Sequence, residues 1–215
     1  MNVKPAIGVF GGTFDPIHFG HLRMALESKW ALGLDEMRLM PCHLPPHRQS
    51  PQLGSEQRVN LLNLALEGTP ELQLELCELK RTDPSYTIDS ISWLRQQGLQ
   101  TNSITLLMGM DAFANLTQWR QWRQLRELAH IAVVMRPGFQ QPLPDPLKQW
   151  LAAADNVSIV HHKPAGGMIL LRQRLLDISA TDIREQLANG RSPRYLLPER
   201  VLDYIESNGL YRPVN

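Results

Sequence analysis

The chain has 215 residues, of which 43% are apolar and 20% are charged, and its formal net charge is +1. This length is sufficient for one full α/β domain and short for two, so we expect a single domain over residues 1–215. The small net charge excludes a global field that would attract nucleic acid or an anionic membrane, and neither is an expected partner. Any anion must therefore be held by a local site.

Cysteine usage and hydropathy argue against a disulfide-rich, secreted or membrane-spanning protein. The two cysteines, Cys42 and Cys77, form no CxxC pair or zinc-ligand spacing, so we expect neither a disulfide framework nor a structural metal. The first residues lack the apolar core of a signal peptide, and no run approaches the roughly 18 apolar residues of a membrane span. The expected location is the reducing cytoplasm.

Apolar runs and helical periodicities then alternate along the chain. The first run, residues 6–10, ends at Gly11-Gly12 and predicts a buried strand stopped by a tight turn. Further strands are expected over residues 37–40, 72–76, 104–108 and 131–134, and helices over residues 22–33, 59–66, 88–98, 111–128, 183–190 and 201–205. The 111–128 helix has a candidate break near Thr117, and residues 140–145 are expected to form a surface excursion. This alternation predicts one doubly wound parallel sheet with helices on both faces.

The segment from Gly11 to His21 follows the first strand and opens the first helix, which is where such sheets bind ligands. Its glycines allow backbone N–H groups to approach a phosphate, and a helix N-terminus favours negative charge. His18 and His21 would share one helix face and could donate hydrogen bonds to phosphoryl oxygens. The alternative is a glycine turn with two surface histidines. A metal site is not indicated, because the chain has no HExxH motif and no third ligand. The chain also has no GxxxxGK[ST] P-loop and no GxGxxG dinucleotide-binding fingerprint.

A second anion site is predicted over residues 178–184, Ile-Ser-Ala-Thr-Asp-Ile-Arg. Ser179 and Asp182 form a Ser-x-x-Asp capping pattern before a helix that ends near Gly190, and Arg184 lies one turn in. Such a cap leaves N–H groups and hydroxyls available for an anion. The structural alternative is an ordinary capped helix with an exposed arginine.

Several other residues have both a functional and a structural interpretation. Thr87 could cap a helix with or without an anion at its N–H groups, and Asp111 could bind ribose hydroxyls or cap the next helix. Trp119 could stack on a flat ring or pack in the core. We expect a surface strand at His161-His162, and a solvated helix face at Arg120, Arg123 and Arg126. Packing roles are expected for Trp93, Trp122 and Trp150.

Two of these segments resemble the signatures of one superfamily. Gly11 to His21 resembles the GxFxPxHxGH signature of the HxGH nucleotidyltransferases, which share a Rossmann-like fold with class I tRNA synthetases. Residues 178–184 resemble the ISxTxIR signature of the same superfamily, with Ala180 at a variable position. The resemblance implies that His18, His21 and Arg184 are catalytic and stabilise charge during nucleotidyl transfer. It assigns ATP binding to Gly11, Gly12, Thr13, Phe14, His18, His21, Gly109, Asp111, Ser179, Thr181 and Arg184.

Three further segments resemble the bacterial nicotinate mononucleotide adenylyltransferases. They are Pro45-Pro46-His47-Arg48, Pro84-Ser85-Tyr86-Thr87, and Met108-Gly109-Met110-Asp111 followed by Trp119. With the two phosphate motifs and Arg136-Pro137-Gly138, the similarity runs in order through nearly the whole chain. It implies transfer of AMP from ATP to nicotinate mononucleotide, giving deamido-NAD and pyrophosphate, a step of NAD biosynthesis. It assigns mononucleotide binding to Arg48, Tyr86, Thr87, Trp119, Arg120 and Arg136.

Arg120 departs from the aromatic residue common at its place in the family. The resemblance implies that backbone N–H groups near Thr87 and Arg120 receive the nicotinate carboxylate, and a backbone donor survives a side-chain change. Mg²⁺ is expected with ATP, held by substrate oxygens and water rather than by a protein carboxylate cluster. A related enzyme acting on nicotinamide mononucleotide or phosphopantetheine, and a catalytically silent nucleotide-binding module, stay open as alternatives. The sequence indicates no particular oligomeric state.

Overall fold

The computed structural model describes residues 4–44, 50–81, 83–136 and 138–212. Within these residues, six parallel strands form one sheet in the order β3-β2-β1-β4-β5-β6. The strands are β1 (Ala6–Gly12), β2 (Glu36–Pro41), β3 (Leu72–Leu74), β4 (Ser103–Gly109), β5 (His130–Val134) and β6 (Met168–Leu171). After β3 the chain crosses to β4 on the other side of β1, which makes the carboxyl ends of β1 and β4 the switch point where such sheets bind ligands. The predicted doubly wound parallel sheet is confirmed.

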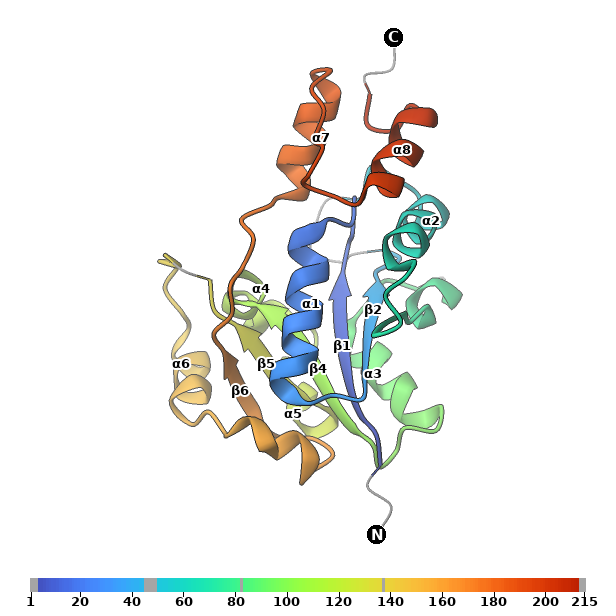
Figure 1. The fold of residues 1–215 in the computed structure, drawn as a ribbon. Helices are drawn as coiled ribbons and strands as arrows, with labels where there is room; N and C mark the ends of the chain where they lie inside the picture. Colours follow the sequence, from blue (N-terminus) through green and yellow to red (C-terminus); the bar gives the residue numbers. More distant parts are fainter. Residues whose placement is uncertain (1–3, 45–49, 82, 137, 213–215) are drawn as a thin grey trace.

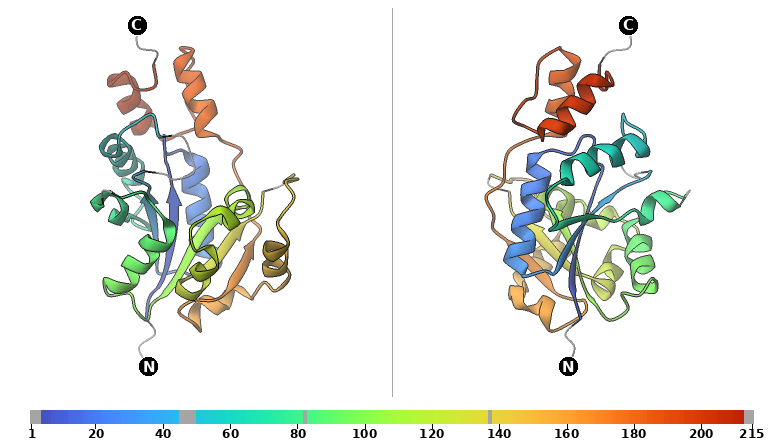
Figure 2. Two further views of the ribbon diagram at one scale, coloured as in Figure 1. Left: turned by 180° about the vertical axis from the view of Figure 1, so that it is seen from behind. Right: turned by 45° about the vertical axis from the view of Figure 1, so that its right-hand side comes forward.

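Helices cover both faces of this sheet (Figures 1 and 2). One face carries α1 (Phe19–Leu32) and α2 (Ser55–Leu66), and the other carries α3 (Thr87–Gln96), α4 (Met110–Ala114), α5 (Leu125–Leu128) and α6 (Asp145–Ala152). In Figure 1, α7 (Ala180–Ala188) and α8 (Glu199–Ser207) lie beyond the carboxyl end of β1, at the end of the molecule opposite the N-terminus. Short 3₁₀ helices are η1 (Cys77–Lys80), η2 (Leu116–Gln118), η3 (Trp122–Gln124) and η4 (Val157–His161). No helix among the described residues is both long and apolar enough to cross a membrane.

The apolar run of β1 serves two cores at once. Phe10 packs with residues of α1 and α2, whereas Val9 packs with residues of α3 and α4. Successive side chains of a strand point to opposite faces, and a sheet that is covered on both faces needs apolar residues at both. This explains why β1 has a continuous rather than an alternating apolar sequence.

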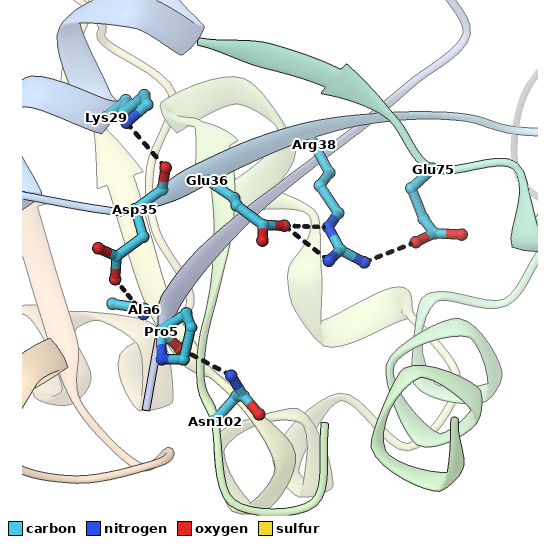
Figure 3. A network of polar contacts seen from close by, with 8 residues as sticks. All are labelled: Pro5, Ala6, Lys29, Asp35, Glu36, Arg38, Glu75 and Asn102. Atoms are coloured by element: carbon cyan, nitrogen blue, oxygen red, sulfur yellow. Dashed lines mark hydrogen bonds and ion pairs between the residues drawn. The ribbon is translucent and has the colours of Figure 1, made fainter. Parts of the chain in front are cut away.

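The amino end of β1 is fixed by polar contacts (Figure 3). The Asp35 carboxylate accepts a hydrogen bond of 2.7 Å from the Ala6 N–H, and Asn102 donates one of 3.0 Å to the Pro5 carbonyl. On β2, Arg38 pairs with Glu36 at 2.6 Å and with Glu75 at 3.1 Å. The Asp35 and Asn102 contacts hold the amino end of β1, whereas the Arg38 pairs join β2 to the segment that follows β3.

The structure corrects the prediction for residues 111–128, which form four short pieces rather than one helix broken once. Trp119 is extended, with ψ of 143°, and Gln121 adopts a left-handed conformation with φ of 51°. This kink allows both Trp122 and Leu125 to be buried. Arg120, Arg123 and Arg126 therefore do not share one helix face, and Arg126 donates hydrogen bonds to the Gly166 carbonyl.

Four further elements differ from expectation. β1 continues through Gly11-Gly12 instead of stopping there. β6 and α6 were not predicted, because apolar patterns of four and eight residues are too short for periodicity to identify. His161 ends η4 rather than lying on a strand, and its Nε2 is 3.0 Å from the Leu32 carbonyl oxygen at the end of α1.

Candidate active site

The loop between β1 and α1 folds around one buried ring. Phe14 is 1% exposed and has a left-handed φ of 50°. A Cβ atom on Gly12 would lie 2.8 Å from the Phe14 ring, closer than side chains can approach, so this turn needs glycine there. The exposed fraction of 1% refers to the whole residue, so Phe14 presents almost no surface to a ligand. The Phe14 side chain shapes the loop instead.

His18 and His21 lie side by side at the start of α1. His18 is the N-cap residue and is 4% exposed. The two imidazole rings stack with centroids 3.7 Å apart and planes at 24°, and the Phe14 ring meets His21 edge-on at 5.1 Å. The Nδ1 atoms of both histidines are buried and have no hydrogen-bond partner among the described residues. The predicted shared face is confirmed, but His18 is not a surface residue.

Burial controls the charge of this pair. Loss of hydration lowers the pKa of His18 to about 4. Burial, and next the proximity of His18, lower the pKa of His21 well below its usual value. Both rings are therefore neutral near pH 7 in the absence of ligand. Each neutral ring has one N–H donor, and a bound polyanion would favour its protonated form.

Arg184 brings the second predicted segment to this loop. Its Nη1 donates a hydrogen bond of 2.7 Å to the carbonyl oxygen of Asp15, and its Nη2 donates one of 3.3 Å to Thr181 Oγ1. Ser179 caps α7 by accepting from the Thr181 N–H at 3.2 Å, as predicted. Asp182 accepts from the Gln186 side chain and does not complete a capping box with Ser179.

Asp15 is a structural centre of the site that the sequence interpretation missed. Its carboxylate is buried and accepts hydrogen bonds from the N–H groups of Gln52, at 2.8 Å, and Leu53, at 3.3 Å. It also accepts one of 2.7 Å from the hydroxyl of Tyr211, whose pKa is raised by burial and by this carboxylate. Asp15 thereby joins the β1–α1 loop to two distant segments. The sequence offered no sign of this beyond an aspartate before a proline.

Gly109, Asp111 and Arg136 meet at the ends of β4 and β5. Gly109 is the N-cap of α4, so Asp111 does not cap that helix. Asp111 is exposed and pairs with Arg136 at 3.2 Å, and Arg136 also pairs with Asp177 at 2.8 Å. The hydrogen bond that Arg136 donates to the Asp111 carboxylate is the main cause of the raised pKa of Arg136. Asp177 was not predicted from the sequence.

The predicted pyridine-binding residues form a separate group at the start of α3. Tyr86 is the N-cap, and Thr87 is the first helical residue without a side-chain capping bond, so the predicted Thr87 cap is wrong. The Arg120 guanidinium lies over the Tyr86 ring, 4.9 Å from its centroid, and pairs with Asp89 at 3.3 Å. Trp119 is half-buried against the core beside α3. Arg48 lies outside the described residues.

Other features lie away from these groups. Trp122 is buried, and Trp93 and Trp150 pack against the same core, as predicted. Two shallow hollows of about 510 and 520 Å³ occur at the amino edge of the sheet and share Glu127, Pro164 and Ala165. No predicted site residue lines either of them. No group of three or more His, Cys, Asp or Glu that could hold a metal ion occurs in the part of the chain that the structure describes.

The chain is similar to known proteins over most of its length. A cytidylyltransferase-like family model matches residues 9–186. A protein of Cellvibrio japonicus named "Probable nicotinate-nucleotide adenylyltransferase" is 46% identical over 211 residues, which cover 98% of this chain and all of that protein. A protein of the same name from Aeromonas hydrophila is 46% identical over 213 residues, covering 98% and 99% of the two chains.

The fold is also found in solved structures. The nicotinic acid mononucleotide adenylyltransferase of Plasmodium falciparum, complexed with NaAD, superposes with a TM-score of 0.73 at 15% identity and covers 95% of this chain and 96% of its own. That likeness concerns the fold, whereas the nearly full-length sequence similarity establishes the family. The chain belongs to the cytidylyltransferase-like superfamily and, within it, to the nicotinate-nucleotide adenylyltransferase family.

Proposed function

We propose that this protein transfers AMP from ATP to nicotinate mononucleotide, giving deamido-NAD and pyrophosphate, a step of NAD biosynthesis. The observation that carries the proposal is the stacked His18–His21 pair beside a glycine-containing loop, with Arg184 joined to the same loop. The 46% identity with nicotinate-nucleotide adenylyltransferases over nearly the whole chain supports the substrate. We propose the cytoplasm as its location, in keeping with these small phosphorylated substrates.

The reaction needs little acid–base chemistry. A phosphate oxygen of the mononucleotide attacks the α-phosphorus of ATP, and the bond to the pyrophosphate leaving group breaks. That phosphate is largely dianionic near pH 7, because its second pKa is about 6, so no general base is required to activate it. The protein must instead position two polyanions and neutralise the charge that develops on the phosphoryl oxygens and the leaving group.

The loop and the two histidines suit the ATP phosphates. The Thr13 N–H, directly after β1, and the positive end of α1 favour an anion at this place. In addition, two neutral imidazoles can donate N–H hydrogen bonds, and phosphate oxygens would raise their pKa and favour the charged form. Arg184 adds a permanent positive charge. The site thus acquires positive charge as the reaction develops negative charge.

Mg²⁺ would bind with ATP and supply further neutralisation of the phosphate charge. The nearby carboxylates of Asp111 and Asp177 both form ion pairs with Arg136. Since their charge is already compensated by the arginine, they are poor ligands for Mg²⁺. We therefore propose that substrate oxygens and water hold the ion, as Mg²⁺ commonly prefers in sites that bind nucleotides. The protein residues then act on the phosphates directly.

The mononucleotide would occupy the other side of the switch point. Trp119 is half-buried and can stack on the pyridine ring through an exposed part of its indole, while the first N–H groups of α3 face the carboxylate. Pyrophosphate release with a panel of acceptors tests the proposal. Nicotinate mononucleotide should be the best acceptor, and activity restricted to nicotinamide mononucleotide or phosphopantetheine would favour a related enzyme. Absence of pyrophosphate release with every acceptor would favour a silent nucleotide-binding module.

A further inference from the structure

Arg58, in α2, is a fully buried arginine at the carboxyl edge of the sheet, and its side chain is 1% exposed. Its Nη1 donates to the Thr13 carbonyl at 2.8 Å, and its Nη2 donates to the Cys42 carbonyl at 2.7 Å and to Ser55 Oγ at 3.2 Å. Its Nε donates to the Leu53 carbonyl at 3.2 Å. All of these hydrogen bonds go to carbonyl or hydroxyl oxygens and none goes to a carboxylate, so the guanidinium joins the β1–α1 loop to the segments around Cys42 and Leu53.

These contacts determine how the loop peptides are turned. The Cys42 N–H donates 2.9 Å to the Gly12 carbonyl, and Arg58 binds the next carbonyl, that of Thr13. In a trans peptide the N–H points opposite to the C=O. The N–H groups of Thr13 and Phe14 therefore point away from β2 and from Arg58. Neither forms a hydrogen bond with another described residue.

We propose that Arg58 is a positioning residue for ATP: it holds the Thr13 carbonyl directly and, through the Cys42 carbonyl, the residue whose N–H binds the Gly12 carbonyl, so that the Thr13 N–H faces the phosphates. The inference rests on the proposed function only in naming the anion as ATP. Without the guanidinium, the carbonyls of Thr13, Cys42 and Leu53 lose their donor, and the loop peptide becomes free to rotate. Binding of ATP would then have to order the loop, and the buried positive charge would be lost.

Arg95 provides a matched control at the opposite edge of the sheet. It also donates to main-chain carbonyls of several segments, including Leu128 at 2.6 Å, Asn102 at 2.6 Å and Pro164 at 2.8 Å. Its removal should lower stability through the same loss of carbonyl partners. None of its hydrogen bonds goes to the β1–α1 loop. Any change in the Kd of ATP in an Arg95 variant therefore measures the effect of lost stability alone.

The experiment compares Arg58→Met, Arg58→Lys and Arg95→Met with the unchanged protein. It measures the thermal midpoint, the Kd of ATP by calorimetry, and KM and kcat for both substrates. We expect Arg58→Met to weaken ATP by about tenfold or more, with KM for the mononucleotide changed by less than about threefold. Arg58→Lys keeps the charge but lacks the planar fork. Its Kd for ATP should therefore lie between the values of the unchanged protein and Arg58→Met. Arg95→Met should lower the thermal midpoint and change ATP binding by less than about twofold.

Two results would overturn the inference: unchanged ATP binding in Arg58→Met, or equal weakening in Arg95→Met. If Arg58→Met does not fold, the comparison of Arg58→Lys with Arg95→Lys decides in the same way. The calorimetric Kd needs no turnover, so it separates this inference from the proposed function. Normal ATP binding that depends on Arg58, together with no pyrophosphate release, would overturn the proposed function alone.

Discussion

Arg184 Nη1 lies 2.7 Å from the carbonyl oxygen of Asp15, so the two predicted phosphate motifs are in direct contact although 169 residues separate them. This hydrogen bond holds α7 against the loop that precedes His18 and His21. No backbone N–H of the described residues donates to the Asp15 carbonyl, because the Phe19 N–H donates to the Leu196 carbonyl instead, and this leaves the Asp15 carbonyl to the arginine. ATP phosphates bound at this loop would therefore lie near the Arg184 charge.

Replacing Arg184 tests that contact. Arg184→Ala should raise KM for ATP by about tenfold or more, because one charged hydrogen-bond donor contributes about 1.5 to 3 kcal/mol. The fold should persist, since the side chain is partly exposed. Steady-state kinetics at saturating mononucleotide gives the KM. Arg191→Ala, an exposed arginine after α7, is the control, and an equal change in that variant would contradict the specific role of Arg184.

His21→Ala should lower kcat by about 10² to 10³, since removing one preorganised donor to a transition-state charge typically has that effect. The thermal midpoint is measured in parallel. His161→Ala removes a histidine at the far end of α1, near the Leu32 carbonyl, and should keep full turnover. Full activity in a folded His21→Ala protein would remove His21 from the catalytic residues.

The buried histidines also predict how stability depends on pH. The pKa of His18 is about 4 in the folded protein and near 6.5 in the unfolded chain, so the unfolded chain binds more protons between these values. The free energy of unfolding is therefore unaffected by His18 above pH 6.5. It falls by about 3 kcal/mol on account of this residue as the pH decreases toward 4. His21 acts in the same direction.

Urea unfolding at pH 7, 5.5 and 4.5 measures this loss, with ATP absent. His18→Asn should show a flatter dependence of the unfolding free energy on pH than the unchanged protein. Addition of ATP should reduce the acid loss, because phosphates favour the protonated imidazoles. Identical slopes in the two proteins would show that His18 is not held neutral by burial.

The sequence predicted the sheet and the two phosphate motifs because their signals are local. Five strands were recognisable as apolar runs, and the Ser179 cap as a short pattern before a helix. The contacts that assemble the site are not local. Asp15 binds residues that are 37 and 196 positions away, and Arg58 is buried where a helix pattern gives no reason to expect an arginine.

Helix boundaries at the site were also hard to predict. Thr87 is a better capping residue than Tyr86 by its own chemistry, yet the turn places Tyr86 at the N-cap. The break after Thr117 depends on the left-handed Gln121, a conformation that the burial of Trp122 and Leu125 favours and that no local pattern indicates. Tertiary packing decided both positions.

Trp119→Ala should weaken nicotinate mononucleotide binding by about 1 to 3 kcal/mol, by analogy with the loss of a base stacked on an aromatic side chain. ATP binding should change little. Trp93→Ala is the matched control, because Trp93 is also partly buried against the same core. Calorimetric titration with each ligand distinguishes the two roles. Equal losses for both ligands in Trp119→Ala would identify Trp119 as a packing residue only.

The most direct test of the whole account compares nicotinate mononucleotide with nicotinamide mononucleotide in one assay, at one concentration of ATP and Mg²⁺. A carboxylate facing the first N–H groups of α3 gains charge-assisted hydrogen bonds that a neutral carboxamide lacks, and one such bond contributes about 1.5 to 3 kcal/mol. We predict that kcat/KM favours the acid by at least about 10². Comparable values for the two acceptors would contradict the acid-specific site and the assignment of nicotinate mononucleotide as the preferred substrate.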